Sequence, residues 1–490
     1  MSSHHKVVDV DCSDGDKLDS MEKSNIFISS SGTIKKDWLS VEEVSARRKA
    51  DWTIIPLLTL GLTVFQLDRM NLSSALTRGF QRDVHTTQEQ VNVGNFLMFA
   101  GIIVLELPSN LMLMKLGPRI WLSSQVILFG LVATLQTLLR NPEGFYITRL
   151  ILGFCEAGYI PGSLYILSTW YIQNELGLRI GIFFCGMFGG MSLSPLLATA
   201  ILKLDSHEGM AGWQWIFLIE GLLTVLVGIV IFIFIPHSPA KASNITGLNL
   251  QKFSQRDEYI LQQRLKMEGR LIRSHVSIAT VYRTLSYWKR WPHFLATALV
   301  FGTWSPLTTY TPSIFVSLGF EKSIASALTS IGSALTLAVT ISVGAVSDYM
   351  GSRGMWVAIP IALYLIALVL LRTIQPHVGT WGRFGLWTTV NAFAVGYHAQ
   401  QNTWLQANCG SLEERCISVS LWVMSAMTGL MCGTQIFQEK DAPEGYSTGI
   451  EAMIGMVSCG LLVVALQGLI YATHNRQIQR GSKEGSFHIL

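Results

Sequence analysis

Long apolar runs, separated by short polar loops, follow one another along most of the chain. Twelve of them reach the roughly 20 mostly apolar residues that a helix needs to cross a bilayer, where backbone polar groups must bond within the segment. In the first half these runs cover residues 52–76, 92–114, 120–139, 144–168, 180–202 and 213–235. In the second half they cover residues 292–317, 324–346, 355–372, 383–405, 416–437 and 450–473. The pattern predicts an all-α polytopic membrane protein with twelve transmembrane helices.

The polar segments divide the chain into five predicted parts. They are a disordered cytoplasmic tail (1–51), a six-helix bundle (52–236), a cytoplasmic central loop (237–290), a second six-helix bundle (291–474) and a cytoplasmic tail (475–490). Two sets of six spans, on either side of one long charged loop, indicate an internal duplication.

The distribution of Lys and Arg predicts the orientation in the membrane. Short loops alone do not decide it, because five of these residues lie in the predicted inner loops and eight in the outer ones. Near the spans, the tails and the central loop add fifteen more on the inner side. Both termini are therefore predicted to be cytoplasmic.

The composition supports a membrane protein and excludes other classes. The mean hydropathy is +0.39 and 14% of residues are charged, against about 25% in soluble domains. A soluble enzyme, a small secreted disulfide-rich domain and a disordered scaffold are excluded. The net charge of +4 comes without a dense basic block, so no nucleic-acid partner is expected. The seven cysteines show neither CxxC pairs nor zinc spacing, so we expect no metal and no cofactor.

Charged residues inside the predicted spans are costly in lipid and are therefore functional candidates. All those near the middle of a span lie in the first half: Asp68, Arg69, Glu106, Arg149, Glu156 and Glu220. This asymmetry assigns the ion chemistry to the N-terminal half. The C-terminal half is then expected to supply polar and aromatic surface.

The spacing of these charges suggests how they act. Arg149 and Glu156 are two helical turns apart and share one face, whereas the adjacent Asp68 and Arg69 point about 100° apart. A carboxylate whose arginine partner can leave is suited to carrying a proton, and a free arginine is a bidentate ligand for a substrate carboxylate. The alternative is a static network of charges that joins two helices. Glu106 and Glu220 fit gating, capping or structural roles better.

Two loops at corresponding places in the halves predict a gate at the inner surface. The sequence GAVSDYMGSR (344–353) follows the pattern G-x-x-x-D-[RK]-x-G-[RK]-R, except that Tyr349 and Ser352 stand where it has basic residues. The sequence NLMLMKLGPR (110–119) keeps Lys115, Gly117 and Arg119 of this pattern but has Met114 in place of the acid. A glycine turn with an acid–arginine contact would hold such a gate shut. The predicted gate residues are Glu106, Lys115, Arg119, Asp348 and Arg353.

Over residues 52–473 the chain resembles the major facilitator superfamily, including an R-x-x-x-G feature within RLILGFCEAGYIPG (149–162). More narrowly, four strings are similar to the anion:cation symporter family: LDRMN (67–71), ELPSN (106–110), CEAGYIPG (155–162) and WQWIFLIEG (213–221). DAPEGY (441–446) is similar to its fungal allantoate, nicotinate and pantothenate permease-like branch.

The resemblance implies proton-coupled symport of a small organic anion by alternating access, in the major facilitator fold. The anion would be a carboxylate such as a vitamin, a ureide or a sugar acid. Arg69 would bind the substrate carboxylate, Asp68 and Glu156 would form the proton-coupling pair, and Arg149 would be the accompanying base. The resemblance also implies a monomer, in the plasma membrane.

Substrate sites in such folds lie at the midplane between the repeats. Together with Arg69, the predicted substrate-binding set is Tyr159, Trp304, Tyr310, His398 and Gln401. These side chains offer stacking and neutral hydrogen bonds, although for each one taken alone helix packing is the better explanation. Other functions left open are export of an acidic metabolite and nutrient sensing without transport. An enzyme is not expected, since no nucleophile–base set or metal-ligand spacing is found.

Overall fold

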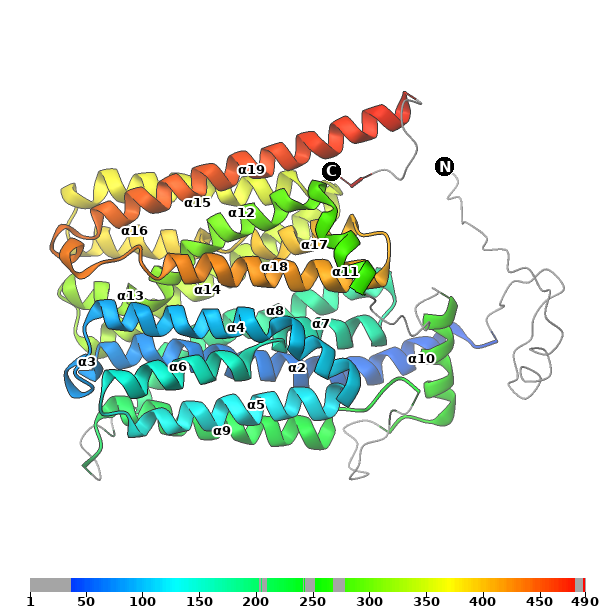
Figure 1. Ribbon diagram of the computed structural model, residues 1–490, viewed down its shortest axis with the longest axis horizontal. Coiled ribbons are helices and arrows are strands. Elements are labelled where there is room, and N and C mark those ends of the chain that lie inside the picture. The colour runs from blue at the N-terminus through cyan, green and yellow to red at the C-terminus, as the bar shows by residue number, and fades with distance from the viewer. Residues whose placement is uncertain are drawn as a thin grey trace.

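The computed structural model of the chain describes residues 37–201, 204, 209–240, 242, 252–267, 278–480 and 488–489. Its regular elements are helices that run roughly parallel to one another, with those of the first half of the chain packed beneath those of the second (Figure 1). The architecture is that of an all-helical bundle in two halves.

The helices of the first half are α2 (Ser40–Leu76), α3 (Phe80–Asp83), α4 (Gln88–Leu116), α5 (Pro118–Leu135), α6 (Pro142–Glu156), α7 (Tyr159–Trp170), α8 (Gln173–Ile201) and α9 (Gly212–Phe234). Two helices lie in the central loop, α10 (Gln255–Met267) and α11 (Ile278–Ser286). The second half contains α12 (Trp291–Gly302), α13 (Trp304–Ser317), α14 (Lys322–Met350), α15 (Met355–Ile374), α16 (Thr380–Phe393), α17 (His398–Ala407), α18 (Leu412–Gly433) and α19 (Ser447–Gln479).

Eight helical segments in the described part of the chain are long and apolar enough to cross a membrane, among them α2, α8, α9 and α19. The other predicted spans fall on α4, on the pairs α12–α13 and α16–α17, and on α18. The chain is therefore a multi-pass membrane protein. The number of twelve spans and the cytoplasmic termini stay predictions.

Three spans predicted as single helices are each interrupted. The run 144–168 is divided between α6 and α7 by Gly158, whose φ of 85° is a conformation that glycine adopts readily. The run 292–317 is divided at Thr303, and the run 383–405 is interrupted between Phe393 and His398. Because the residues on both sides of each break are apolar, hydropathy alone did not reveal it.

The predicted tail 1–51 is also partly helical, because α2 begins at Ser40. The carboxylate of Glu42 caps this start by accepting a hydrogen bond from the backbone N–H of Leu39 (3.0 Å). Residues 1–36 lie outside the described part of the chain. In Figure 1 the start of α2, the end of α19 and both central-loop helices lie at one end of the bundle.

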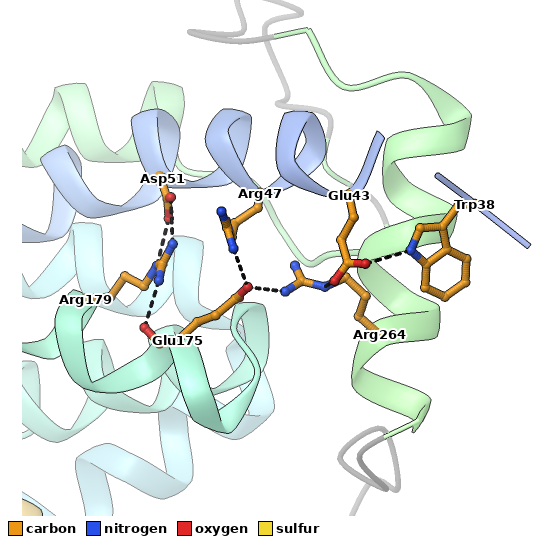
Figure 2. Close-up of polar contacts among 7 residues, drawn as sticks. All are labelled: Trp38, Glu43, Arg47, Asp51, Glu175, Arg179 and Arg264. Carbon is orange, nitrogen blue, oxygen red and sulfur yellow. Dashed lines mark hydrogen bonds and ion pairs between the residues drawn. The ribbon is translucent and has the colours of Figure 1, made fainter. Parts of the chain in front are cut away.

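At that end, helix α10 is tied to the first half by a network of buried ion pairs (Figure 2). Arg264 of α10 pairs with Glu43 (2.9 Å) and with Glu175 at the start of α8. Arg47 also pairs with Glu175, at 3.0 Å. The guanidinium of Arg179 donates hydrogen bonds to both carboxylate oxygens of Asp51 (2.9 and 2.8 Å). The network therefore joins α2, α8 and α10 into one unit.

A second contact at α10 joins Lys49 and Asp257, whose charged atoms are 2.6 Å apart. Burial alone would raise the pKa of Asp257, but hydrogen bonds from Lys49 and Ser254 outweigh it and hold that pKa below its ordinary value. The carboxylate therefore stays charged at any pH near neutrality, and its contribution to the attachment of α10 is lost only in strong acid.

Arg264→Ala is expected to loosen α10. The side chain is only 3% exposed and its removal leaves two buried carboxylates with one cation fewer, which costs roughly 3 kcal/mol. Hydrogen exchange of the α10 amides should therefore become about 100-fold faster. The control is Arg256→Ala on the same helix, whose side chain is 44% exposed and whose ion pairs are 3.5 Å long. Equal acceleration in both variants would show that the buried network does not hold α10.

The two halves of the chain are hydrogen-bonded to each other at the opposite end of the bundle. The amides of Gln88 and Asn92 both donate to the carbonyl of Phe437 (3.1 and 3.2 Å). Arg78 donates to the hydroxyl of Ser323 at 2.7 Å, and the hydroxyl of Tyr310 donates to Asn92. These bonds join the two halves at the end of the bundle that is predicted to be outer.

Candidate functional site

Two neighbouring cavities lie between the halves, and both are lined by Gln66, Arg69 and Trp304. The first is also lined by Ser73, Asn95, Met98, Phe99, Thr308 and Thr309, among others. The second is also lined by Phe65, Phe184, Phe301, His398, Trp422 and Met427, among others. Arg69, a cationic side chain of the first half, therefore faces both cavities.

The guanidinium of Arg69 is paired with Glu156. Its Nε and one terminal nitrogen each lie 2.8 Å from the same oxygen, Glu156 Oε2. The arginine side chain is 11% exposed and the glutamate side chain is fully buried. Glu156 Oε1 has no hydrogen-bond partner among the described residues. The arginine thus reaches the cavity, while the carboxylate lies behind it.

The helix break immediately after Glu156 is fixed by two polar side chains. The backbone N–H of Gly158 donates to Glu106 Oε2 at 2.9 Å, and the amide of Gln125 donates to the carbonyl of Ala157. Glu106 therefore caps the break and positions Glu156, and its role in the gate stays a prediction. Of the roles considered for Glu106, the capping role fits its place.

Asp68 lies beside Arg69 in the chain but lines neither cavity. It is 1% exposed, and neither of its carboxylate oxygens has a hydrogen-bond partner in the described part of the chain. It lies near Glu220 of α9, with which it interacts electrostatically. The amide nitrogen of Asn71 donates hydrogen bonds to the carboxylate of Glu220 and to the carbonyl of Leu67. Asp68 and Glu220 therefore face each other inside the first half.

Arg149 is buried within the same half. Its guanidinium lies 5.3 Å from the ring of Phe145, and one nitrogen is 3.6 Å from the sulfur of Met98. Two other guanidinium nitrogens have no hydrogen-bond partner among the described residues. The structure therefore pairs Glu156 with Arg69 and not with Arg149.

In the second half, Trp304 and His398 line the cavities, and both lie next to helix breaks. His398 begins α17 and is 7% exposed. Its ring stacks on Phe301 with centroids 4.0 Å apart, and its centroid is 4.2 Å from that of Trp422. The breaks of the span 292–317 and the span 383–405 thus meet at one cavity wall.

The other three predicted substrate ligands line neither cavity. The hydroxyl of Tyr159 donates to the carbonyl of Leu58 (3.2 Å), and its ring stacks on Phe65. Tyr310 is bonded to Asn92 in the contact between the halves, and the amide of Gln401 is 3.1 Å from His293 Nδ1. Each of these side chains already has an internal hydrogen-bond partner, which fits the alternative of helix packing.

The predicted gate residues bond within their own halves. Arg119 donates to the carbonyl of Phe232 (3.0 Å), and Arg353 lies 3.3 Å from both Ser347 and Gln400. Lys115 is exposed, and the side chain of Asp348 lies outside the described part of the chain. The turn glycines of both loops have positive φ angles, 85° at Gly117 and 67° at Gly351. Both loops therefore turn at a glycine, but with different conformations, since ψ is 155° at Gly117 and 7° at Gly351. The acid–arginine contact stays a prediction.

Several cavity residues were not predicted from the sequence, namely Gln66, Asn95, Phe301 and Trp422. Gln66 lies three residues before Arg69 on the same helix face, which is a signal that could have found it. The aromatic residues gave no such signal, because buried, cavity-facing and lipid-facing aromatic side chains look alike in an apolar run.

The chain belongs to the Major Facilitator Superfamily, which it matches over residues 58–436. It is 25% identical over 451 residues to the uncharacterized transporter YIL166C of Saccharomyces cerevisiae, covering 90% of this chain and 82% of that protein. It is 30% identical over 327 residues to the putative metabolite transport protein NicT of Pseudomonas putida, covering 65% and 71%.

A solved structure with the same fold is that of a bacterial homologue of the human lysosomal transporter Spinster, in an inward-facing and occupied conformation. The TM-score is 0.61 at 15% sequence identity, and the match covers 85% of this chain and 96% of the other. This likeness shows the fold alone. The fold, the family and the relatives together define a membrane transporter for small molecules.

Proposed function

We propose that this transporter couples the movement of a small organic anion to that of a proton. The observation that carries the proposal is the Arg69–Glu156 pair, whose arginine faces both cavities while its carboxylate is fully buried. A substrate carboxylate that binds the Arg69 guanidinium competes directly with Glu156. The carboxylate displaced in this way is left buried without a cation, which favours its protonation.

The competition makes proton and substrate bind together. Arg69 can neutralise only one carboxylate, either that of Glu156 or that of the substrate. If the substrate binds while Glu156 is not protonated, one buried negative charge is left unpaired, and that state is costly. Asp68 and Glu220 are buried near each other, and two carboxylates in such a place repel each other unless they share a proton. Asp68 is therefore proposed as a second proton site, and Arg149 as the base that accompanies Glu156 on helix α6.

Alternating access would come from rocking of the two halves around this site. The end predicted to be outer is closed by the bonds from Gln88, Asn92 and Arg78 to the second half. The helix breaks beside Glu156, Trp304 and His398 place flexible points next to the cavities. We further propose that the protein acts as a monomer in the plasma membrane and belongs to the anion:cation symporter branch.

The test is uptake of radiolabelled carboxylates into cells that express the protein, at pH 5 and pH 7.5, with and without a protonophore. The panel contains nicotinate, pantothenate, biotin, allantoate, sugar acids and dicarboxylates. We expect uptake of one compound that is several-fold faster at pH 5 and is abolished by the protonophore. In Glu156→Gln the pH dependence should disappear, because the variant cannot exchange a proton at this position.

The matched control is Glu89→Gln, which removes an exposed acid of the same half. It should keep both uptake and its pH dependence. An uptake rate that changes neither with pH nor in Glu156→Gln would refute proton coupling and would indicate a facilitator. Acid-dependent release from preloaded cells, without uptake, would indicate an exporter, and neither uptake nor release of any compound would favour a sensor.

A further inference from the structure

The cavity between Arg69 and His398 has few polar groups. On its first-half wall they are Arg69 and Gln66, and on its second-half wall they are the imidazole of His398 and the indole N–H groups of Trp304 and Trp422. The indole nitrogen of Trp422 is buried and has no hydrogen-bond partner among the described residues. The rest of the lining is aromatic or aliphatic, with Phe301, Trp304 and Trp422 on the second-half side. A ligand in this space therefore meets one cation at one end and one imidazole at the other.

His398 is held so that only the edge of its ring is available. One face is stacked on Phe301, with an interplanar angle of 18°, and Trp422 lies 4.2 Å away at 31°. The Nδ1 atom is buried and has no hydrogen-bond partner among the described residues. A buried polar atom without a partner is costly unless a ligand or water bonds it, and His398 lines the cavity, so this ring edge is an unfilled hydrogen-bonding position at the cavity wall.

From this arrangement we propose that the substrate is a planar aromatic monocarboxylate whose ring bears a hydrogen-bonding atom. Its carboxylate binds Arg69, its ring lies among Phe301, Trp304 and Trp422, and its ring heteroatom or substituent bonds the edge of His398. The inference rests on the proposed role of Arg69 and adds the chemical class of the substrate. It assigns His398 the role of distinguishing one ring from another.

The same lining disfavours other carboxylates. A sugar acid brings several hydroxyl groups, more than His398 and Trp422 can bond, and each remaining hydroxyl would lose its bonds to water without gaining a partner here. The neighbouring cavity is more polar, but the hydroxyls of Ser73, Thr308 and Thr309 already donate to backbone carbonyls there. A dicarboxylate would need a second cation, and Arg69 is the cationic residue that lines the two cavities.

The experiment measures binding of five probes to the purified full chain by calorimetry: pyridine-3-carboxylate, benzoate, cyclohexanecarboxylate, gluconate and succinate. We expect benzoate to bind about fivefold more tightly than cyclohexanecarboxylate, because aromatic pairs gain from stacking. Pyridine-3-carboxylate should bind about tenfold more tightly than benzoate, the usual effect of one buried hydrogen bond. Gluconate and succinate should bind most weakly.

The informative variant is His398→Phe, which keeps a ring between Phe301 and Trp422 but removes both nitrogens. It should abolish the advantage of pyridine-3-carboxylate over benzoate and leave benzoate binding within about twofold. A merely structural histidine would instead weaken all probes alike. Tyr159→Phe is the control, because its hydroxyl is bonded to Leu58 and lines neither cavity.

Each outcome separates this inference from the proposed function. The inference would be overturned if gluconate or succinate bound more tightly than the aromatic acids. It would also be overturned if His398→Phe still preferred pyridine-3-carboxylate to benzoate, or if none of the five probes bound. Proton-coupled uptake of a sugar acid would overturn the substrate class while supporting symport. Binding of the aromatic acids as predicted, with uptake that ignores pH, would support the substrate class and refute proton coupling.

Discussion

Replacing Arg69 by glutamine is expected to reduce substrate uptake by at least about 100-fold. The guanidinium is the cation that both cavities share, and loss of a charged hydrogen-bond donor to a buried carboxylate costs about 3 kcal/mol or more. Arg69→Lys keeps the charge but loses the fork that binds two carboxylate oxygens, so we expect it to retain only a few per cent of the uptake. Initial uptake rates, normalised to the protein at the cell surface, measure both effects.

The single variant also leaves Glu156 buried without its cation, which is destabilising in its own right. The double variant Arg69→Gln/Glu156→Gln removes both charges and should recover the folded yield but not the uptake. Arg48→Gln is the control on the same helix, since Arg48 is exposed and lines neither cavity. If the double variant transports normally, Arg69 is only one member of a static charge network.

The charged residues of this site could be predicted from the sequence, because a charged side chain is costly in lipid. That cost singled out Arg69 and Glu156, and the structure places them in one ion pair at the cavity wall. The same argument could not tell which charge faces which neighbour. Asp68 faces Glu220, and Arg149 lies against Phe145 and Met98, because these contacts depend on how three or four helices pack.

The neutral part of the site was harder to predict. Trp304 and His398 line the cavities, whereas Tyr159, Tyr310 and Gln401 are bonded internally. A polar side chain in a span has the same chemistry whether it bonds a neighbouring helix or a ligand, so only the three-dimensional contacts decide between the two.

The fold was predictable to the level of apolar helices in two halves, because hydropathy reports burial over about 20 residues. The helix breaks were not, because they depend on local geometry such as the positive φ of Gly158 and the capping of its N–H by Glu106. Two of the three breaks lie beside residues that line the cavities, and the third follows Glu156. The helix breaks, which the hydropathy pattern did not reveal, therefore lie at the candidate site.

Gly186→Val is expected to lower the stability of the first half by about 3 kcal/mol. Helices α2 and α8 approach so closely there that a side-chain carbon added at Gly186 would lie 2.4 Å from the backbone carbonyl oxygen of Thr59. A backbone atom cannot move aside as a flexible side chain can, so the helices must separate, and overpacking of this kind costs about 1–3 kcal/mol. The thermal midpoint of the purified protein and its folded yield from membranes measure the effect.

Gly189→Val, one turn further along the same helix, is the matched control, because a carbon added there meets nothing within 4 Å. The two substitutions have the same intrinsic effect on helix formation, so this effect cancels in the comparison. Gly190 also approaches α2, where an added carbon would lie 2.6 Å from the carbonyl oxygen of Thr63. A loss of stability that is equal in the two variants would mean that added bulk anywhere on α8 is harmful, and the close approach to Thr59 would then have no special role.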